Sequence, residues 1–307
     1  MRRRSCDIIV YIMSLQKSVL TEEKIAQLTQ KAMEIRRSII ESLIEAKSGH
    51  TAGPLGMADI FTYLYFHKLK HDPKKSDWQY RDRLVLSNGH ICPVLYATMA
   101  HSGYFPVAEL KTLRKFGSRL QGHPHREYLP GLENSSGPLG SGLSQTVGMA
   151  LADRIDNGKS SGKQFYCLMS DGELNEGNSW EGAMLAGKER LQNLTIIIDR
   201  NNIQIDGFTE DIMPLNPLVD KWRAWNFHVQ EINGHDFREI DRAVCEAQSV
   251  FDKPSVIIAH TIPSKGIPEF ERKFEWHGKP PGTPEEIETA LKAVRSWGGR
   301  VKLPEHN

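Results

Sequence analysis

A strand–helix–strand pattern at residues 165–207 constrains this 307-residue chain more than any other feature. Two short apolar runs, FYCLMS and LTIIID, are rich in β-branched and aromatic residues and predict strands. Between them lies NSWEGAMLAGKERL, whose apolar residues recur at helical spacing: Trp180, Met184, Ala186 and Leu191. Such a βαβ unit makes its two strands parallel, so their carboxyl ends share the sheet edge where open α/β folds bind ligands.

Oxygen-bearing side chains follow both strands of this unit. Asp171 comes after the first strand and Asn201 after the second. Because both lie at one sheet edge, a carboxylate and an amide oxygen could face one cation, and Mg²⁺ prefers such oxygen ligands completed by water and phosphate. Gly172 lets the backbone approach a phosphate, and the amides that open the next helix would attract its charge. Each turn alone reads as an ordinary Asp-Gly or Asn-Asn turn; together they favour a metal–diphosphate site.

The rest of the chain continues the same alternation. DRLVLS, FHVQEI and PSVIIAHT predict three more strands, and DFREIDRAVCEAQSV predicts a helix between the last two. A long amphipathic helix is predicted to start at the cap Thr21 and to end at Gly49, and TPEEIETALKAVRSW predicts a final helix. The sequence therefore predicts an α/β fold, a doubly wound, mostly parallel sheet with helices on both faces.

Composition excludes several classes of protein. A net charge of +1 leaves no electrostatic footprint for nucleic acid, and no segment could span a membrane. The four cysteines form no CxxC pair, so neither a zinc site nor a disulfide framework is indicated and a cytoplasmic location fits. The glycine-rich loop GPLGSGLSQ lacks a clean GxGxxG, because Gln145 stands where the third glycine belongs, which disfavours a nicotinamide dinucleotide site.

The N-terminal segment MRRRSCDIIVYIMSLQ has a basic cluster before an apolar run. Asp7 interrupts that run, which is also too short for a signal peptide. We interpret residues 1–12 as a translation-start artefact or a loose tail ahead of Met13. On this interpretation residues 1–20 are a loose extension, and residues 21–307 form one domain.

The unit around Asp171 also resembles a known family. DG followed some thirty residues later by NN is the thiamine diphosphate motif, and SDGELNEGNSWEGAMLA and IDRNNIQIDG look like transketolase. One departure is Ser170, which replaces the usual glycine. The resemblance implies the thiamine diphosphate-binding fold of the diphosphate-binding (PP) domain. It also implies that Asp171, Asn201 and the carbonyl of Ile203 bind Mg²⁺, or another divalent cation such as Ca²⁺, which holds the diphosphate together with Gly172.

Four histidines stand in sequence words of the same family, SGH, LSNGH, QGHPH and WHG: His50, His90, His123 and His277. The resemblance implies that His50, His123 and His277 orient substrate hydroxyls and assist proton transfer, a task that suits imidazole near neutral pH. It places His90 against the cofactor and His277 near both the diphosphate and the substrate. His125 has no counterpart in the family pattern and is interpreted as a surface residue.

Two further segments carry the resemblance. GPLG is similar to the segment whose backbone approaches the aminopyrimidine ring, which implies cofactor contacts for Gly137, Pro138 and Leu139. A flexible glycine loop is the alternative interpretation. Glu176 matches a family glutamate at the subunit interface near the cofactors, which implies a catalytic and cofactor-binding role. Its alternative is a solvated turn residue.

The resemblance runs from about Thr21 but corresponds to the first half of a transketolase. The family's second domain supplies the glutamate that protonates the aminopyrimidine, the aromatic ring that stacks on it, and most substrate-phosphate contacts. The implied protein is the N-terminal subunit of a split transketolase, which transfers a two-carbon ketol unit from a ketose phosphate to an aldose phosphate. Its implied partner is the C-terminal, pyrimidine-binding subunit, in a heterotetramer.

Two alternatives remain. The α subunit of a 2-oxo acid dehydrogenase is also a diphosphate-binding half-chain, but it lacks the SGH, SNGH and GHP words. A non-catalytic, partner-binding derivative of the domain is the other, and the retention of Asp171, Asn201 and all four histidines speaks against it.

Overall fold

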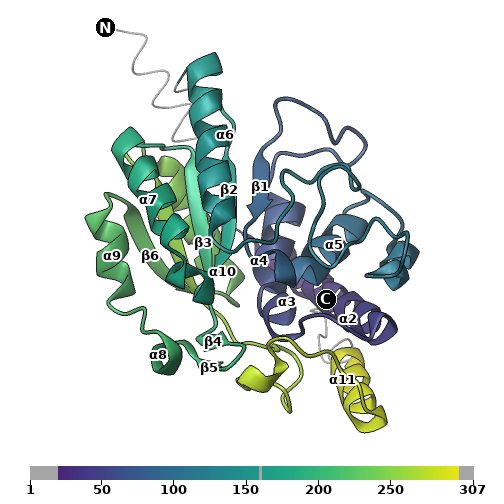
Figure 1. Ribbon diagram of the computed structural model, residues 1–307. Helices are drawn as coiled ribbons and strands as arrows, with labels where there is room; N and C mark the ends of the chain where they lie inside the picture. Colours follow the sequence, from purple (N-terminus) through teal and green to yellow (C-terminus); the bar gives the residue numbers. More distant parts are fainter. Residues whose placement is uncertain (1–19, 159–160, 297–307) are drawn as a thin grey trace, which may run out of the picture.

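The central sheet has five parallel strands in the order β1-β2-β3-β7-β6 (Figure 1). The computed structural model describes residues 20–158 and 161–296, so the interpretation of residues 1–12 as a loose tail lies outside the described residues. The strands are β1 (Arg83–Leu86), β2 (Phe165–Ser170), β3 (Leu194–Arg200), β6 (His228–Asn233) and β7 (Ser255–His260). All five correspond to predicted strands, which confirms the parallel α/β sheet.

Helices cover both faces of this sheet (Figure 1). One layer contains α2 (Glu22–Ala46), α4 (Ala58–Tyr63), α5 (Cys92–His101) and α10 (Phe237–Ser249), and the other contains α6 (Ser141–Asn157), α7 (Gly177–Glu189) and α9 (Leu218–Ala224). Successive side chains of β2 alternate between the two cores: Tyr166 and Leu168 face the first, Cys167 and Met169 the second. The predicted doubly wound arrangement is confirmed.

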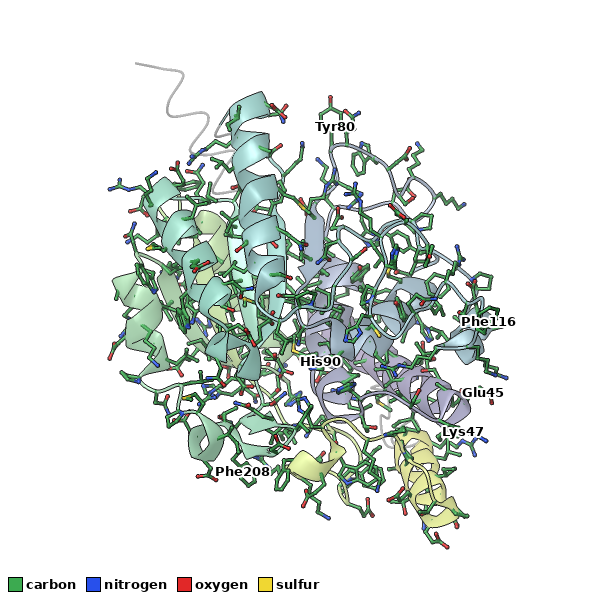
Figure 2. All side chains as sticks on the ribbon, in the orientation of Figure 1. Glu45, Lys47, Tyr80, His90, Phe116 and Phe208 are labelled. Atoms are coloured by element: carbon green, nitrogen blue, oxygen red, sulfur yellow. The ribbon has the colours of Figure 1, made fainter. Side chains whose placement is uncertain are left out.

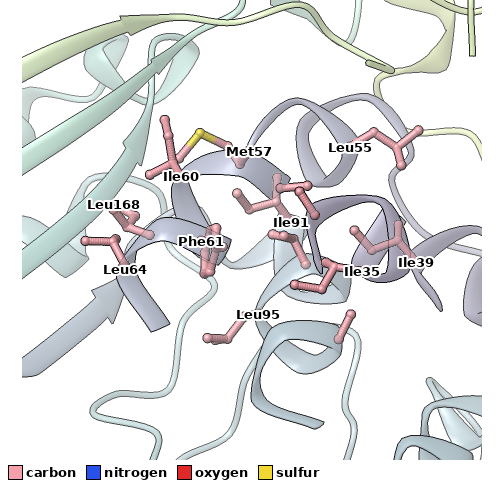
Figure 3. Close-up of a cluster of buried hydrophobic side chains, with 14 of the residues drawn as sticks. Ile35, Ile39, Leu55, Met57, Ile60, Phe61, Leu64, Ile91, Leu95 and Leu168 are labelled. Atoms are coloured by element: carbon pink, nitrogen blue, oxygen red, sulfur yellow. The ribbon is translucent and has the colours of Figure 1, made fainter. Parts of the chain in front are cut away.

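The first core draws its apolar residues from segments that are far apart in the sequence (Figure 3). Ile35 and Ile39 of α2 lie in one buried cluster with Phe61 of α4 and Leu95 of α5. Leu168 of β2 joins the same cluster, so this core links the N-terminal helices to the sheet. The remaining α-helices of the described residues are short or peripheral: α3 (Ala52–Gly56), α8 (Thr209–Ile212) and α11 (Pro284–Ser296).

Helix α2 begins as predicted and ends slightly earlier. The hydroxyl of Thr21 accepts a hydrogen bond from the Lys24 amide at 3.2 Å, which caps the helix. The helix ends at Ala46 because Lys47 takes a left-handed conformation, with φ 54°. Gly49, the predicted terminator, lies in the following turn with φ 126°, a conformation that favours glycine.

The α7 segment buries Ala186 and Leu191 as predicted, but not Met184. Met184 is 48% exposed, whereas small residues fill the interface: Gly182, Ala183, Ala186 and Gly187. They are small because the neighbouring backbone is close, and a Cβ atom on Gly187 would lie 1.9 Å from the Trp225 carbonyl oxygen. Trp222 is fully buried beneath this region and belongs to the second core.

This contact yields a stability prediction. Gly187→Ala should lower the free energy of unfolding by about 1–3 kcal/mol, because the backbone must shift to admit the methyl group. Gly148→Ala is the matched control, since Gly148 lies exposed within α6 and no described atom approaches its Cβ position within 4 Å. That change should raise the free energy of unfolding by up to about 1 kcal/mol, because alanine is the better helix former. Urea denaturation of both variants is the measurement, and equal shifts would refute the close contact.

Among the helices within residues 20–158 and 161–296, none combines the length and apolar character needed to cross a membrane.

Candidate active site

The loops that follow β2 and β3 meet at Asp171. This aspartate has no exposed surface, and its Oδ1 accepts a hydrogen bond from the Gly172 amide at 2.7 Å. Its Oδ2 accepts from the Asn202 amide at 2.7 Å and from Arg200 Nη1 at 3.2 Å. Asp171, directly after β2, is thus hydrogen-bonded to Asn202, just after β3. This contact is expected because β2 and β3 are adjacent parallel strands whose carboxyl ends share one edge of the sheet.

The side chain of Asn201 is held from both ends. Its Nδ2 donates to Asp199 Oδ2 at 2.9 Å, and its Oδ1 accepts from the Ile203 amide at 3.0 Å. Ile203 opens β4 (Ile203–Gln204), which forms a small antiparallel ribbon with β5 (Gly207–Phe208). Asp199 also accepts a hydrogen bond from the Thr261 hydroxyl. Asp199 therefore fixes which end of the Asn201 amide faces the turn.

The electrostatics of this region favour a bound cation. Burial raises the pKa of Asp171 to about 6, although Arg200 opposes that shift. Burial, with the nearby charge of Asp171, raises the pKa of Asp199 to about 7. Arg200 contacts Asp171 through Nη1 but pairs with Glu210 through Nη2, and Asp199 accepts hydrogen bonds from the neutral groups of Asn201 and Thr261. A cation would compensate the negative charge of the two buried carboxylates.

The donor set also fits a hard cation. Among the described residues, no group of three or more histidine, cysteine, aspartate or glutamate side chains could hold a metal. A metal here would instead use one carboxylate, one amide oxygen and one main-chain carbonyl, from Asp171, Asn201 and Ile203. Such all-oxygen sets suit Mg²⁺ and Ca²⁺. A cation would share the Asp171 carboxylate with Arg200, which already occupies part of it.

Three of the four predicted histidines form a triangle. The ring centroids of His50 and His90 lie 4.8 Å apart, those of His90 and His277 5.4 Å, and those of His50 and His277 5.6 Å. Figure 2 shows His90 near the middle of the molecule, between α6 and the N-terminal helices. His123 is exposed and lies beside the loop that carries His90. A Cβ atom on Gly89 would be 3.1 Å from the His123 ring. The structure therefore brings together the four loops that carry these histidines.

These histidines are neutral at physiological pH. Burial lowers the pKa of His50 to about 4, with further contributions from His277 and Arg114. Burial also holds the pKa of His90 well below its usual range and lowers those of His123 and His277. Neutral imidazole can both donate and accept hydrogen bonds. The Nδ1 atoms of His50 and His277 are buried and find no hydrogen-bond partner among the described residues, so each keeps an unused hydrogen-bonding position.

Comparison with known proteins identifies the family. The thiamine diphosphate-binding domain of transketolase matches residues 28–299. This chain belongs to the transketolase family. It is 42% identical over 258 residues to the 6-deoxy-6-sulfo-D-fructose transketolase subunit SqwG of Clostridium sp. (strain MSTE9), covering 84% of this chain and 92% of that protein. It is 39% identical to an apulose-4-phosphate transketolase subunit of Phocaeicola vulgatus, over 84% of this chain and 90% of that protein.

Longer transketolases match over part of their length. Transketolase 2 of Escherichia coli is 41% identical over 82% of this chain but only 39% of its own length. The structure of transketolase from Campylobacter jejuni is similar with a TM-score of 0.82 and 37% identity, covering 89% of this chain and 42% of that one. The transketolase chain described here thus spans about two fifths of these longer relatives. The matches favour transketolase over the 2-oxo acid dehydrogenase α subunit.

Glu173 organises this transketolase site, and the sequence pattern does not single it out. It has no exposed surface, and its Oε1 accepts hydrogen bonds from the Ser87 hydroxyl and, at 2.5 Å, from the Gly140 amide. Its Oε2 accepts from the Ser170 amide at 3.1 Å. Burial raises the pKa of Glu173 to about 7. One carboxyl group thereby joins the ends of β1 and β2 to the start of α6.

The predicted cofactor loop at Gly137, Pro138 and Leu139 leads into α6. The Leu139 carbonyl accepts a hydrogen bond from Asn178 Nδ2 at 3.3 Å, which ties the loop to the start of α7. No atom of the described residues lies within 4 Å of a Cβ position on Gly137, so the backbone there faces open space. A ligand can therefore approach this backbone without displacing side chains.

The segment that carries His277 is anchored to the His50 loop. The Thr51 hydroxyl donates to the Lys279 carbonyl at 2.6 Å, and a Cβ atom on Gly278 would be 3.7 Å from the His50 ring. Glu176, by contrast, is exposed at the start of α7, and its side chain caps no amide of that described helix. Its charge nevertheless reaches the site, since it raises the pKa of Glu173 further.

Proposed function

We propose that this chain is the diphosphate-binding subunit of a two-subunit transketolase, which transfers a two-carbon ketol unit from a ketose phosphate to an aldose phosphate. One observation carries the proposal: a buried oxygen site at Asp171 and Asn201 occurs with a triangle of neutral histidines, in a chain that covers 92% of a relative named as a transketolase subunit. Assay of the chain with and without a partner subunit is the experiment that tests it.

In this proposal the cofactor lies along the loops already described. Asp171, Asn201 and the carbonyl of Ile203 would hold Mg²⁺, or Ca²⁺, and the Gly172 backbone would meet the diphosphate. His90, His277 and the loop Gly137–Pro138–Leu139 would lie against the rest of the cofactor. Bound thiamine diphosphate supplies the nucleophilic carbon and the electron sink for cleavage beside the ketose carbonyl.

The histidines would bind the sugar hydroxyls and transfer protons. His50, with a pKa of about 4, is suited to hydrogen bonding with sugar hydroxyls rather than to holding a proton at neutral pH. His123 is exposed and can exchange a proton with solvent, so it can move the proton of a substrate hydroxyl. His277 would orient the substrate beside His50. Partial exclusion of water from the half-buried rings of His50 and His277 strengthens these hydrogen bonds.

A second subunit would complete the site. A ligand held only at its diphosphate end loses much of the contact area that offsets its lost translational freedom. We propose a pyrimidine-binding partner and a cytoplasmic heterotetramer. Met184 and Leu185 of α7 support this assembly, since they are 48% and 40% exposed and lie on the helix that begins at Glu176, the proposed interface residue.

His123→Ala should lower turnover far more than cofactor affinity. We expect kcat/KM of the assembled enzyme to fall roughly 100-fold or more, because proton transfer and orientation by one side chain contribute on that order. The affinity for thiamine diphosphate should change less than about threefold, since the proposed contacts are with sugar hydroxyls. Steady-state kinetics and calorimetry are the measurements, with His260→Ala, an exposed histidine on β7, as control. A larger loss of cofactor affinity than of turnover would place His123 against the cofactor instead.

A further inference from the structure

A hollow of about 590 Å³ opens beside His123, away from the Asp171 site. Its walls combine two cationic, two imidazole and two hydroxyl side chains: Arg114, Lys115, His123, His125, Ser135 and Ser136. No carboxylate of the described residues lines it. A cavity with this lining favours an anion over a cation or an apolar group.

Arg114 is held in place without an ion pair. Its Nη1 donates to the Ser48 hydroxyl and its Nη2 to the Gly122 carbonyl, both at 3.5 Å. A Cβ atom on Gly122 would lie 3.0 Å from the guanidinium carbon, so the glycine makes room for this group. Within residues 20–158 and 161–296, no carboxylate forms a salt bridge with Arg114. Its charge and most of its donors are therefore available to a ligand.

The neighbouring cations differ in this respect. Lys115 forms an ion pair with Glu45, and Arg119 binds Glu109 through Nε at 2.6 Å. Arg114 contributes to the lowered pKa values of His50 and His123, but burial is the larger cause, so both histidines stay neutral without its charge.

His125, interpreted from the sequence as a surface residue, is half-buried and lines this hollow. Its ring stacks on Tyr128 with centroids 4.2 Å apart and planes at 17°. Its Nδ1 is buried and has no hydrogen-bond partner among the described residues. Beside it, the Ser135 hydroxyl oxygen accepts from the Arg126 amide at 3.1 Å, which leaves its own O–H free to donate.

We propose that this hollow binds the anionic end of the sugar substrate, a tetrahedral oxyanion such as a phosphate or a sulfonate. Arg114 supplies the charge and a planar pair of donors, while His125 and Ser135 add hydrogen bonds. His123 also lines the hollow, so the lining of this hollow would contact both a sugar hydroxyl and the terminal anion. The inference rests on the proposed transketolase function, and it assigns part of the substrate's charge recognition to this chain rather than wholly to the partner.

Two acceptors that differ in charge test the inference in the assembled enzyme. With unphosphorylated hydroxypyruvate as donor, Arg114→Gln should raise KM for ribose 5-phosphate roughly 10- to 100-fold, the range expected for losing a charge-assisted hydrogen bond. KM for glycolaldehyde and both kcat values should stay within about twofold. Arg119→Gln is the matched control, because that arginine is paired with Glu109. Equal changes in KM for both acceptors, or no change in either, would overturn the inference.

A binding experiment separates this inference from the proposed function. Inorganic phosphate and methanesulfonate are titrated into the full chain while the ring signals of His123 and His125 are followed by NMR. Saturable shifts that Arg114→Gln abolishes would support the oxyanion site, and the tighter of the two ions would indicate phosphate or sulfonate chemistry. Absence of shifts with both ions would overturn it. If the assembled protein shows no ketol transfer at all, the proposed function fails while this titration still reports on the hollow.

Discussion

Replacing Asp171 with asparagine should abolish Mg²⁺-dependent binding of thiamine diphosphate to the assembled enzyme. The proposed metal site contains one protein carboxylate, and its loss leaves the diphosphate facing fewer positive charges. Loss of an outer partner of a metal site already costs 10- to 100-fold in affinity, so removal of the negative charge of the one charged ligand should cost at least about 100-fold. The asparagine NH₂ group would also point at amide donors of Gly172 or Asn202, which both bond to the carboxylate. Calorimetric titration of the cofactor in the presence of Mg²⁺ is the measurement.

Two further variants make this result interpretable. Asp211→Asn removes an exposed carboxylate of α8 and should leave the affinity unchanged. Asn201→Ala removes a proposed ligand yet leaves the hydrogen bonds of Asp171 in place, and it should weaken cofactor binding roughly 10-fold or more. An unchanged affinity in both Asp171→Asn and Asn201→Ala would refute the metal assignment.

The central strands of the sheet could be predicted because they are short, almost wholly apolar runs. All six residues of β2 and all seven of β3 are buried, and buried parallel strands read as continuous hydrophobic segments. The face of α7 could not be predicted in the same way. Periodicity assigns the large side chain of Met184 to the core, but close backbone approach at Gly187 selects small residues and leaves Met184 outside.

The meeting of Asp171 and Asn201 followed from topology, because Ser170 and Asp199 are register partners at the ends of two adjacent parallel strands. Glu173 could not be found from spacing. It joins Ser87, 86 positions away, and Gly140, 33 positions away, and only the folded chain brings these groups together. A charged residue inside or directly after an apolar strand is a usable signal, because a buried carboxylate must find partners. That signal would have marked Asp199.

The three histidines of the triangle were predicted as site residues from the family resemblance alone. His50 follows α2, His90 follows β1 and His277 lies beyond β7, and no periodicity relates three such loops. Their contact depends on tertiary packing, including the bond from Thr51 to the Lys279 carbonyl. Sequence patterns near each histidine describe local turns and carry no information on these long-range contacts.

The second large effect concerns assembly. The purified chain should show no measurable ketol transfer, because the proposed partner supplies the carboxylic acid that activates the aminopyrimidine and much of the cofactor's binding surface. Activity should appear when the partner subunit is added, with a heterotetramer as the active particle. Size-exclusion chromatography with light scattering would measure the mass of the mixture. A mixture that remains two separate species would contradict the proposed assembly.

The most direct test of a two-subunit transketolase is ketol transfer from xylulose 5-phosphate to ribose 5-phosphate, with Mg²⁺ and thiamine diphosphate. Three samples are compared: this chain, its candidate partner, and their mixture, with the Asp171→Asn chain mixed in parallel as control. We predict turnover only in the mixture that contains the unaltered chain. Robust turnover by this chain alone would contradict the split-subunit account, and a mixture that forms a complex yet transfers no ketol unit from any ketose donor would favour a non-catalytic binding protein.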